Sequence, residues 1–292
     1  KARPAYMLPS IMPARASALT GRSAHHHGVF TNGWELDASQ PTFVRCLQAA
    51  GVQTFGVGKF HLECHGRSAY NDVRKYGFDR TEVTEDIRAG DWLDWVESTS
   101  PEHAAEALST VWPMPHLQDY GPSHRNLLAD VKRTRERFAG PGGAFKPQCT
   151  PIPENLCQTH WIVERALTMM AERDRGRPFF LKVSFVDPHD PYDPPERFVK
   201  RIAADRIPLP VHSEDAAIAS LGDRLRDNPF VARAAELSAP QWVEIRQNYL
   251  ASVAFLDEQV GRLLAALEAA DIAGQTEVIF TGDPGHIGGP QC

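Results

Sequence analysis

Apolar residues follow two different patterns in the second half of the chain. Between Trp242 and Leu267 they return every three or four positions, which predicts one apolar stripe along a long helix. Residues 178–186 are almost continuously apolar, a pattern typical of a short buried strand, and residues 277–281 have the same character. Further helices are predicted over residues 13–22, 41–50, 86–97 and 154–172, and a β-prone segment over residues 53–57.

Helices that alternate with short apolar strands predict an α/β fold, with a largely parallel sheet flanked by helices. The stretch from about residue 98 to residue 151 departs from this alternation, because Pro, Gly, His and Ser dominate it. We expect a long excursion with little regular structure there.

Polar side chains follow each predicted strand at its carboxyl end. Lys59 and His61 follow the first strand, Asp187 and His189 the second, and Asp283 the third. Ligand sites of open α/β sheets lie outside the carboxyl ends of the strands, so we expect these side chains to meet. The combination suits an anion held by cations, with or without a metal. The alternative is that the aspartates only cap turns.

Composition and charge exclude several classes of protein. The chain has 292 residues, of which 31 are basic and 37 acidic, and its formal net charge is −6. A nucleic-acid-binding protein would normally show a basic face. No apolar run approaches the roughly 20 residues of a membrane helix. We expect no nucleic-acid or membrane partner and take the cytoplasm as the default location; the sequence predicts no oligomeric state.

The five cysteines are too sparse for a disulfide framework, and none has zinc-ligand spacing. Cys149 and Cys157 are near enough in sequence to pair locally, but two reduced thiols are the favoured interpretation.

Six blocks, in order along nearly the whole chain, resemble the sulfatase family. The first resembles the core of the family pattern Cys-x-Pro-x-Arg, followed by a Leu-Thr-Gly-Arg-like helix. The others resemble the family's His-Gly…Asn-Gly, Gly-Lys-Trp-His-Leu and Pro-Phe-Phe-Leu…Asp-Pro-His-x-Pro-Tyr stretches and two later blocks. In this sequence the six blocks lie at residues 12–22, 27–33, 58–62, 178–195, 256–262 and 278–283.

The resemblance implies an alkaline-phosphatase-like α/β fold and hydrolysis of a small-molecule or carbohydrate sulfate ester. Residues 1–292 would then form a partial sulfatase-type catalytic domain. In the family, the motif cysteine is oxidised to formylglycine, whose hydrated aldehyde supplies the nucleophilic hydroxyl. A divalent cation, usually calcium, lowers the pKa of that hydroxyl.

The family's roles carry over to matching positions in this sequence. The resemblance implies that Arg15 hydrogen-bonds the nucleophile and a metal ligand, and that Lys59 contacts the nucleophile and the sulfate. His61 would act as the base that expels sulfate. His189 would bind the ester oxygen and help protonate the leaving group, and Asp283 would ligate the metal. Structural readings remain open for two of them: Lys59 as a solvated loop cation and His189 as a turn residue.

The sequence departs from the family pattern at the nucleophile and at the metal. Ile11 occupies the nucleophile position and cannot become formylglycine. Ser10 is adjacent, but an offset of one residue would turn its side chain away. Pro284 stands where the family has a further metal ligand. The family's first strand, with two metal-binding carboxylates, and its smaller C-terminal subdomain have no counterpart in these residues. We therefore expect the chain as written to be inactive.

Three hypotheses remain. The chain belongs to a sulfate ester hydrolase lineage; or it is a non-catalytic relative that binds sulfate or phosphate esters through Arg15, Lys59, His61 and His189; or it hydrolyses phosphodiesters or phosphonate monoesters on the same scaffold. The first is our prediction. A cysteine or serine at residue 11 of a parent sequence would distinguish the first hypothesis from the second.

Overall fold

A computed structural model of the chain describes residues 10–64, 68–112, 126–138, 145–209, 232–234 and 236–283. The chain divides into two compact units. The first comprises Lys1–Gly140, Pro151–Val186 and Glu258–Pro284, and the second comprises Pro141–Thr150, Asp187–Asp257 and Gly285–Cys292.

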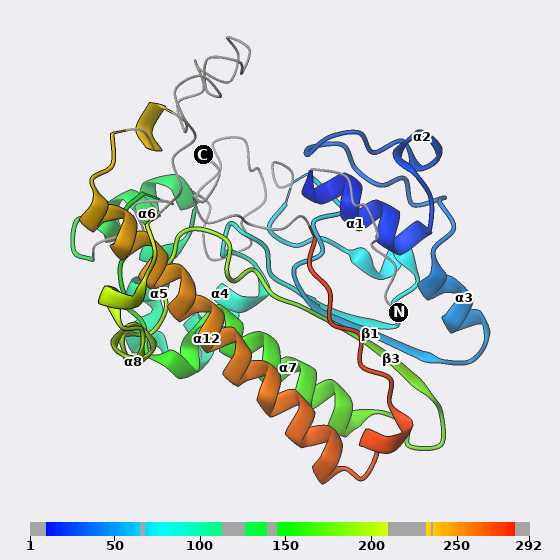
Figure 1. Cartoon of the computed structure of the whole chain (residues 1–292). Coiled ribbons are helices and arrows are strands. Elements are labelled where there is room, and N and C mark those ends of the chain that lie inside the picture. Colours follow the sequence, from blue (N-terminus) through cyan, green and yellow to red (C-terminus); the bar gives the residue numbers. More distant parts are fainter. Residues whose placement is uncertain are drawn as a thin grey trace. The chain divides into compact units, whose positions relative to one another are not determined.

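The sheet lies in the first unit and consists of three parallel strands (Figure 1). β1 (Gln53–Gly58) is central and buried along its whole length, between β2 (Arg80–Val83) and β3 (Phe179–Ser184). Gly58 of β1 is in register with the last residue of each neighbour, so all three strands end at the same edge. The predicted α/β fold with a parallel sheet is confirmed.

Gly58 is required where β1 gives way to the loop that follows. Its φ is +94°, and a Cβ on it would stand 1.9 Å from the carbonyl oxygen of Ser184. Only glycine permits this combination of backbone conformation and close approach. The residue after it is thereby held against β3, where the amide of Lys59 donates to the Ser184 carbonyl at 2.8 Å.

Helices surround the sheet of the first unit. α7 (Gln158–Glu172) packs against β1 and β3, and its buried residues include Trp161 and Ile162. α1 (Ile11–Thr20) contributes Met12 to a core that also contains Phe60. The remaining helices of this unit are α2 (Ala24–His27), α3 (Phe43–Ala49), α4 (Asp91–Thr99), α5 (Ala104–Thr110) and α6 (Leu127–Arg135), with short 3-10 turns η1 (Val73–Tyr76), η2 (Pro101–His103), η3 (Glu154–Leu156) and η5 (Ala273–Gln275).

The second unit has its own apolar cluster. It contains α8 (Glu196–Arg201), η4 (Ala204–Arg206) and the first part of α12 (Ala239–Ala269), the predicted long helix, which contributes residues to both units. Trp242 and Ile245 of α12 pack there with Tyr192.

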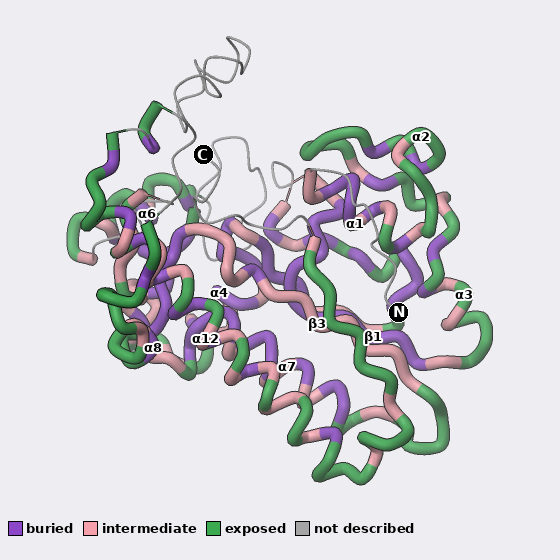
Figure 2. Tube along the Cα trace, viewed as in Figure 1, coloured by how far each residue is buried: buried purple, intermediate pink, exposed green. Residues whose placement is uncertain are grey.

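Two sequence predictions are wrong in part. Residues 277–281 do not form a strand: in the described chain they make no backbone pairing, and Ile279 and Phe280 are each 80% exposed (Figure 2). β-propensity alone does not make a strand, because the backbone needs a hydrogen-bonded neighbour. Residues 98–151 are also more regular than expected, since α5 and α6 lie within them.

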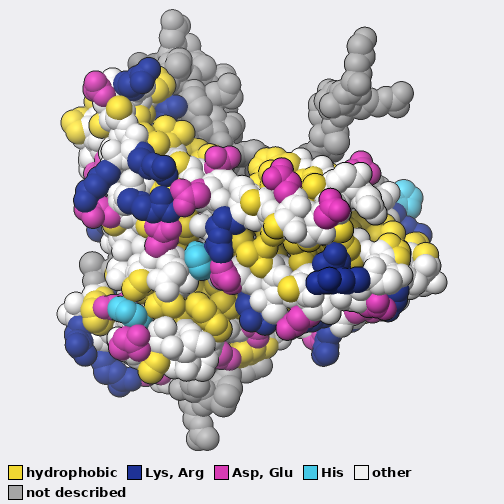
Figure 3. All heavy atoms as spheres, turned by 90° about the horizontal axis from the view of Figure 1, so that it is seen from below, with side chains coloured by type: hydrophobic (Ala, Val, Ile, Leu, Met, Phe, Trp, Pro, Cys, Tyr) yellow, Lys and Arg dark blue, Asp and Glu magenta, His cyan; other side chains and the backbone are white. Residues whose placement is uncertain are grey.

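Charged side chains of both signs lie on one face of the protein. On the face drawn in Figure 3, basic and acidic side chains alternate over short distances. Among the described helices, none is both long and apolar enough to cross a bilayer. The described cysteines, Cys149 and Cys157 among them, are not in disulfides.

Candidate active site

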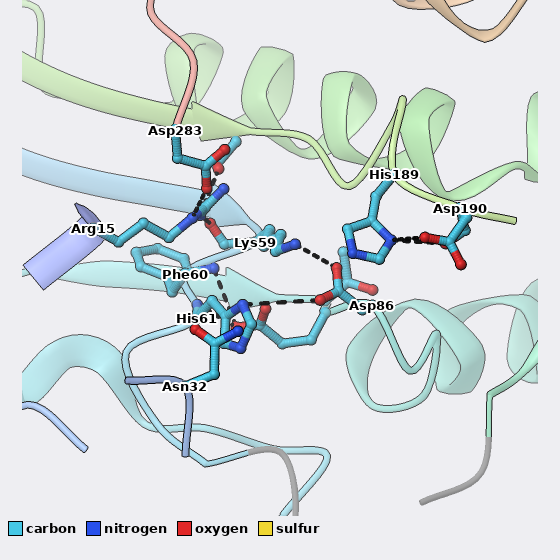
Figure 4. A network of polar contacts seen from close by, with 12 residues as sticks. Arg15, Asn32, Lys59, Phe60, His61, Asp86, His189, Asp190 and Asp283 are labelled. Carbon is cyan, nitrogen blue, oxygen red and sulfur yellow. Dashed lines mark hydrogen bonds and ion pairs between the residues drawn. The ribbon is translucent and has the colours of Figure 1, made fainter. Parts of the chain in front are cut away.

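The end of β1 delivers Lys59 into a buried ion pair. The Lys59 side chain is 3% exposed, and its Nζ lies 2.5 Å from Oδ1 of Asp86 (Figure 4). Asp86 follows β2 in the chain, so the pair joins the carboxyl ends of two neighbouring strands. A buried ammonium requires such a partner, because isolated charges are strongly disfavoured away from water. Lys59 is therefore a buried cation rather than a solvated loop residue.

A second carboxylate fixes the turn that carries His61. Oε1 of Glu85 accepts hydrogen bonds from the backbone N–H groups of Phe60, at 3.1 Å, and His61, at 2.8 Å. Glu85 is 2% exposed. His61 has a φ of +47°, an uncommon conformation for a residue other than glycine, and these two bonds help to hold it. The imidazole Nδ1 lies 3.8 Å from Oδ2 of Asp86, so Asp86 faces both the lysine and the histidine.

Arg15 connects α1 to the strand ends. Its Nη1 donates to the Lys59 carbonyl at 2.6 Å and to the Ser184 hydroxyl at 3.1 Å. Its Nε donates to Oδ2 of Asp283 at 2.5 Å. The structure therefore brings Arg15, Lys59, His61 and Asp283 together at one edge of the sheet. The strand-end rule named Lys59, His61 and Asp283 for this edge, and Arg15 reaches it from α1.

Lys182 is a further cation at this edge that our sequence reasoning missed. From β3, its Nζ donates to the Lys59 carbonyl at 2.9 Å and lies 4.4 Å from the centre of the Phe60 ring. Burial, followed by the charges of Arg15 and Lys59, lowers the pKa of Lys182 well below its ordinary value; Glu85 acts in the opposite direction. The available signal was a single charged residue within an apolar strand.

Glu85 and Asp86 were missed for a different reason. They follow β2, whose sequence Arg-Thr-Glu-Val has no apolar run, so no predicted strand pointed to the residues after it. Their contacts with Lys59 and His61 depend on a strand pairing that periodicity does not reveal.

His189 lies in the second unit. Its Nδ1 is 2.8 Å from the carbonyl oxygen of Asp190 and 3.3 Å from Oδ1 of the same residue. Its meeting with Lys59 and His61 remains a prediction from the sequence.

The nucleophile position lies at the beginning of α1. Ile11 is the first residue of the helix and Ser10 precedes it. Oδ1 of Asn32 accepts from the Ser10 hydroxyl at 2.8 Å and from the amide of Met12 at 3.0 Å. Asn32 therefore caps the helix, and the Ser10 hydroxyl is used as a hydrogen-bond donor to it.

The described residues do not fit the calcium site that the resemblance implies. Calcium takes about 6–8 oxygen ligands. Here the Asp283 carboxylate is bonded to the Arg15 guanidinium, and the described part of the chain has no cluster of three or more His, Cys, Asp or Glu side chains placed to hold a metal. Residue 284, the other position considered, lies outside the described residues.

The chain also matches a family model and curated relatives along most of its length. The Sulfatase family model matches residues 9–290. An arylsulfatase of Clostridium perfringens is 25% identical over 97% of this chain and 54% of its own length, and human iduronate 2-sulfatase is 31% identical over 94% and 46%. The chain spans about half the length of these curated relatives.

The fold is also that of known structures. The crystal structure of the phosphonate monoester hydrolase of Agrobacterium radiobacter matches with a TM-score of 0.60 and 20% identity, over 90% of this chain and 51% of that one. The fold is thus alkaline-phosphatase-like. Six motif blocks in order, a shared sheet edge that gathers their basic side chains and a family match over residues 9–290 lead to one conclusion: the chain belongs to the sulfatase family.

Proposed function

We propose that the protein is of a lineage of sulfate ester hydrolases that act on a small-molecule or carbohydrate sulfate. Its anion site in this proposal is the cluster of Arg15, Lys59 and His61. The observation that carries the proposal is the convergence of these side chains at the end of β1, in a chain that belongs to the sulfatase family. A sulfate monoester carries one negative charge, and a preorganised ammonium and guanidinium stabilise charge on its oxygens.

Each side chain has a distinct task in this proposal. Lys59 and Arg15 bind the sulfate oxygens, and the ion pair with Asp86 directs the Lys59 ammonium group. The imidazole of His61 has its Nδ1 turned toward Asp86, so Nε2 is the atom proposed to exchange a proton with the reacting group. His189 keeps the proposed role of protonating the leaving alcohol. Formylglycine would supply the nucleophilic hydroxyl in a relative that has the motif cysteine.

We further propose that the chain as written turns over no substrate. Isoleucine at position 11 has no nucleophilic atom. The adjacent Ser10 hydroxyl donates to Asn32. An intact cation cluster beside an inert residue 11 also favours the second candidate function, binding of sulfate or phosphate esters without turnover.

The test compares the chain with an Ile11→Cys variant produced together with a formylglycine-generating enzyme. Substrates are p-nitrophenyl sulfate, p-nitrophenyl phosphate and a phenylphosphonate ester, each with added calcium or manganese. Ile11→Ala, produced in the same way, is the matched control because it also changes the side chain but cannot be oxidised.

We expect no turnover from the unaltered chain or from Ile11→Ala. Sulfate-selective turnover from Ile11→Cys alone would support Ile11 as the residue that disables the chain. Turnover by the unaltered chain would refute the assignment of Ile11 as the disabling residue. Silence from all three proteins, with inorganic sulfate bound in calorimetry, would favour the non-catalytic candidate. Turnover of the phosphonate ester but not the sulfate would refute the sulfatase proposal in favour of the third hypothesis.

A further inference from the structure

Three aromatic rings form an exposed ladder in the loop after α1. The His25 and Phe30 ring centres are 5.8 Å apart with planes at 79°, and those of Phe30 and Trp34 are 5.7 Å apart at 89°. Phe30 is 51% and Trp34 53% exposed, although large aromatic side chains gain most from burial. We call His25, Phe30 and Trp34 the aromatic ladder. Exposed apolar surface of this kind commonly marks a binding site.

The backbone on either side of Trp34 is fastened to the anion site. Two residues before it, the Asn32 side chain caps α1 at the amide of Met12, next to the nucleophile position. Two residues after it, the amide of Leu36 donates to the carbonyl of Leu62, the neighbour of His61, at 3.0 Å. Two residues of chain span at most about 7 Å, so Trp34 stays close to both anchors.

The Trp34 side chain also has an unused polar atom. Within the described residues its Nε1 makes no hydrogen bond, and the residue as a whole is 53% exposed. Tryptophan in this state presents a flat apolar surface beside one N–H donor. A sugar ring offers the complementary pair of features, a face of C–H groups and an edge of hydroxyls.

We propose that the aromatic ladder is the subsite for the alcohol part of the ester, and that this part is a sugar ring stacked on Trp34. The inference rests on the proposed function, because it takes the sulfate end to be held by Arg15 and Lys59. A quaternary ammonium group is a poorer match, since it favours a cage of several aromatic faces rather than an open ladder. A plain aryl ring would use the indole face but would offer Nε1 no acceptor in place of water.

The experiment measures binding by calorimetry to the full chain, with three probes: inorganic sulfate, glucose 6-sulfate and p-nitrophenyl sulfate. The variants are Trp34→Ala, Trp34→Phe and Lys59→Ala. Trp112→Ala is the matched control because Trp112 is also an exposed tryptophan of the first unit, 44% exposed. Circular dichroism checks that each variant is folded.

We expect Trp34→Ala to weaken glucose 6-sulfate by about tenfold, the scale of one stacked ring, and to leave inorganic sulfate unchanged. Trp34→Phe should recover part of the loss, and Trp112→Ala should lose nothing. Unchanged sugar sulfate binding in Trp34→Ala, with sulfate still bound, would overturn the subsite and leave the proposed function intact. An equal loss for p-nitrophenyl sulfate would overturn the choice of a sugar. Failure of every protein to bind any probe would refute both proposals, and a sulfate defect confined to Lys59→Ala would support the anion site.

Discussion

Nζ of Lys59 and Oδ1 of Asp86 lie 2.5 Å apart, with side chains that are 3% and 11% exposed. The two residues come from loops after different strands, so their ion pair fastens the ends of β1 and β2 to each other. It also sets the local charge balance, since the carboxylate offsets an ammonium that burial would otherwise disfavour. The pair is therefore both a structural joint and the support of the proposed anion site.

Asp86→Asn should destabilise the protein by about 3 kcal/mol, because it leaves Lys59 buried without its carboxylate. Urea denaturation at neutral pH measures the change. Asp72→Asn is the control: it breaks an ion pair with Arg74 whose side chains are 61% and 62% exposed, and should cost under about 1 kcal/mol. Equal losses in the two variants would show that the Lys59–Asp86 pair is not effectively buried.

Glu85→Ala should loosen the turn at His61 by removing the acceptor of two backbone N–H groups. Two orphaned buried donors cost about 1–3 kcal/mol each, whereas Glu85→Gln keeps an acceptor oxygen and should cost less. Hydrogen exchange followed by NMR gives the local readout. The Phe60 and His61 amides should exchange faster in the alanine variant, and unchanged exchange there would contradict the assignment of Glu85.

Lys182→Met should stabilise the protein at neutral pH. The folded-state pKa of Lys182 lies below the ordinary 10.5, so the unfolded chain holds this proton more readily, and the charged lysine costs folding free energy below that pH. Methionine keeps an unbranched stem without the charge.

The direction of the Lys182 pKa shift gives a second measurement, the pH-dependence of stability. The stability difference between the variant and the original chain should narrow as pH rises toward 10.5. Lys200→Met, at a lysine that is 68% exposed, is the surface control for the loss of a lysine charge. A Lys182→Met variant that is less stable at neutral pH would show that its bond to the Lys59 carbonyl outweighs desolvation.

His27 should make stability fall on acidification. Its Nδ1 accepts from the amide of Val29 at 3.1 Å, and its Nε2 is 2.9 Å from the Ser17 hydroxyl. Burial lowers the pKa of His27 below 6.5; the backbone hydrogen bond opposes this shift, and the charge of His26 adds to it. As pH falls, the unfolded chain therefore takes up the proton before the folded chain does. The contribution of His27 to the free energy of unfolding is constant above pH 6.5 and declines as pH falls below that value.

The check compares unfolding free energies between about pH 7.5 and 5.5. His27→Gln should reduce the pH-dependence over that window. His26→Gln, at an exposed neighbour, removes only the weakest of the three effects on the pKa of His27 and should leave most of the pH-dependence in place. Identical slopes for the original chain and His27→Gln would remove His27 as the cause.

The sequence predicts the parts of the fold whose pattern is local. The 3.6-residue period predicts α12, the β-prone segment at residues 53–57 predicts β1, and the dense apolar run at residues 178–186 predicts β3. The strand-end rule then predicts that Lys59 and Asp283 lie at one edge of the sheet, where both contact Arg15. Asp283 lies there although no strand precedes it.

What the sequence could not predict depends on long-range pairing. β2 has only four residues and a mostly polar pattern, so Glu85 and Asp86 gave no signal of their own. Residues 277–281 have the composition of a strand. A strand also needs a second segment to pair with, and the β-propensity of one segment does not predict whether that partner is present. The exposure of Ile279 is the visible result.

The exposed segment at residues 277–281 affects how the protein behaves in concentrated solution. Among the described strands β3 pairs with β1 alone, so its other edge has no strand partner within the described residues, while Val278, Ile279 and Phe280 are 57–80% exposed. A bare sheet edge and a loose β-prone segment are complementary across molecules as well as within one. Copies of this chain should therefore pair with one another through these segments. The time for which the protein stays unaggregated in solution should shorten as its concentration rises.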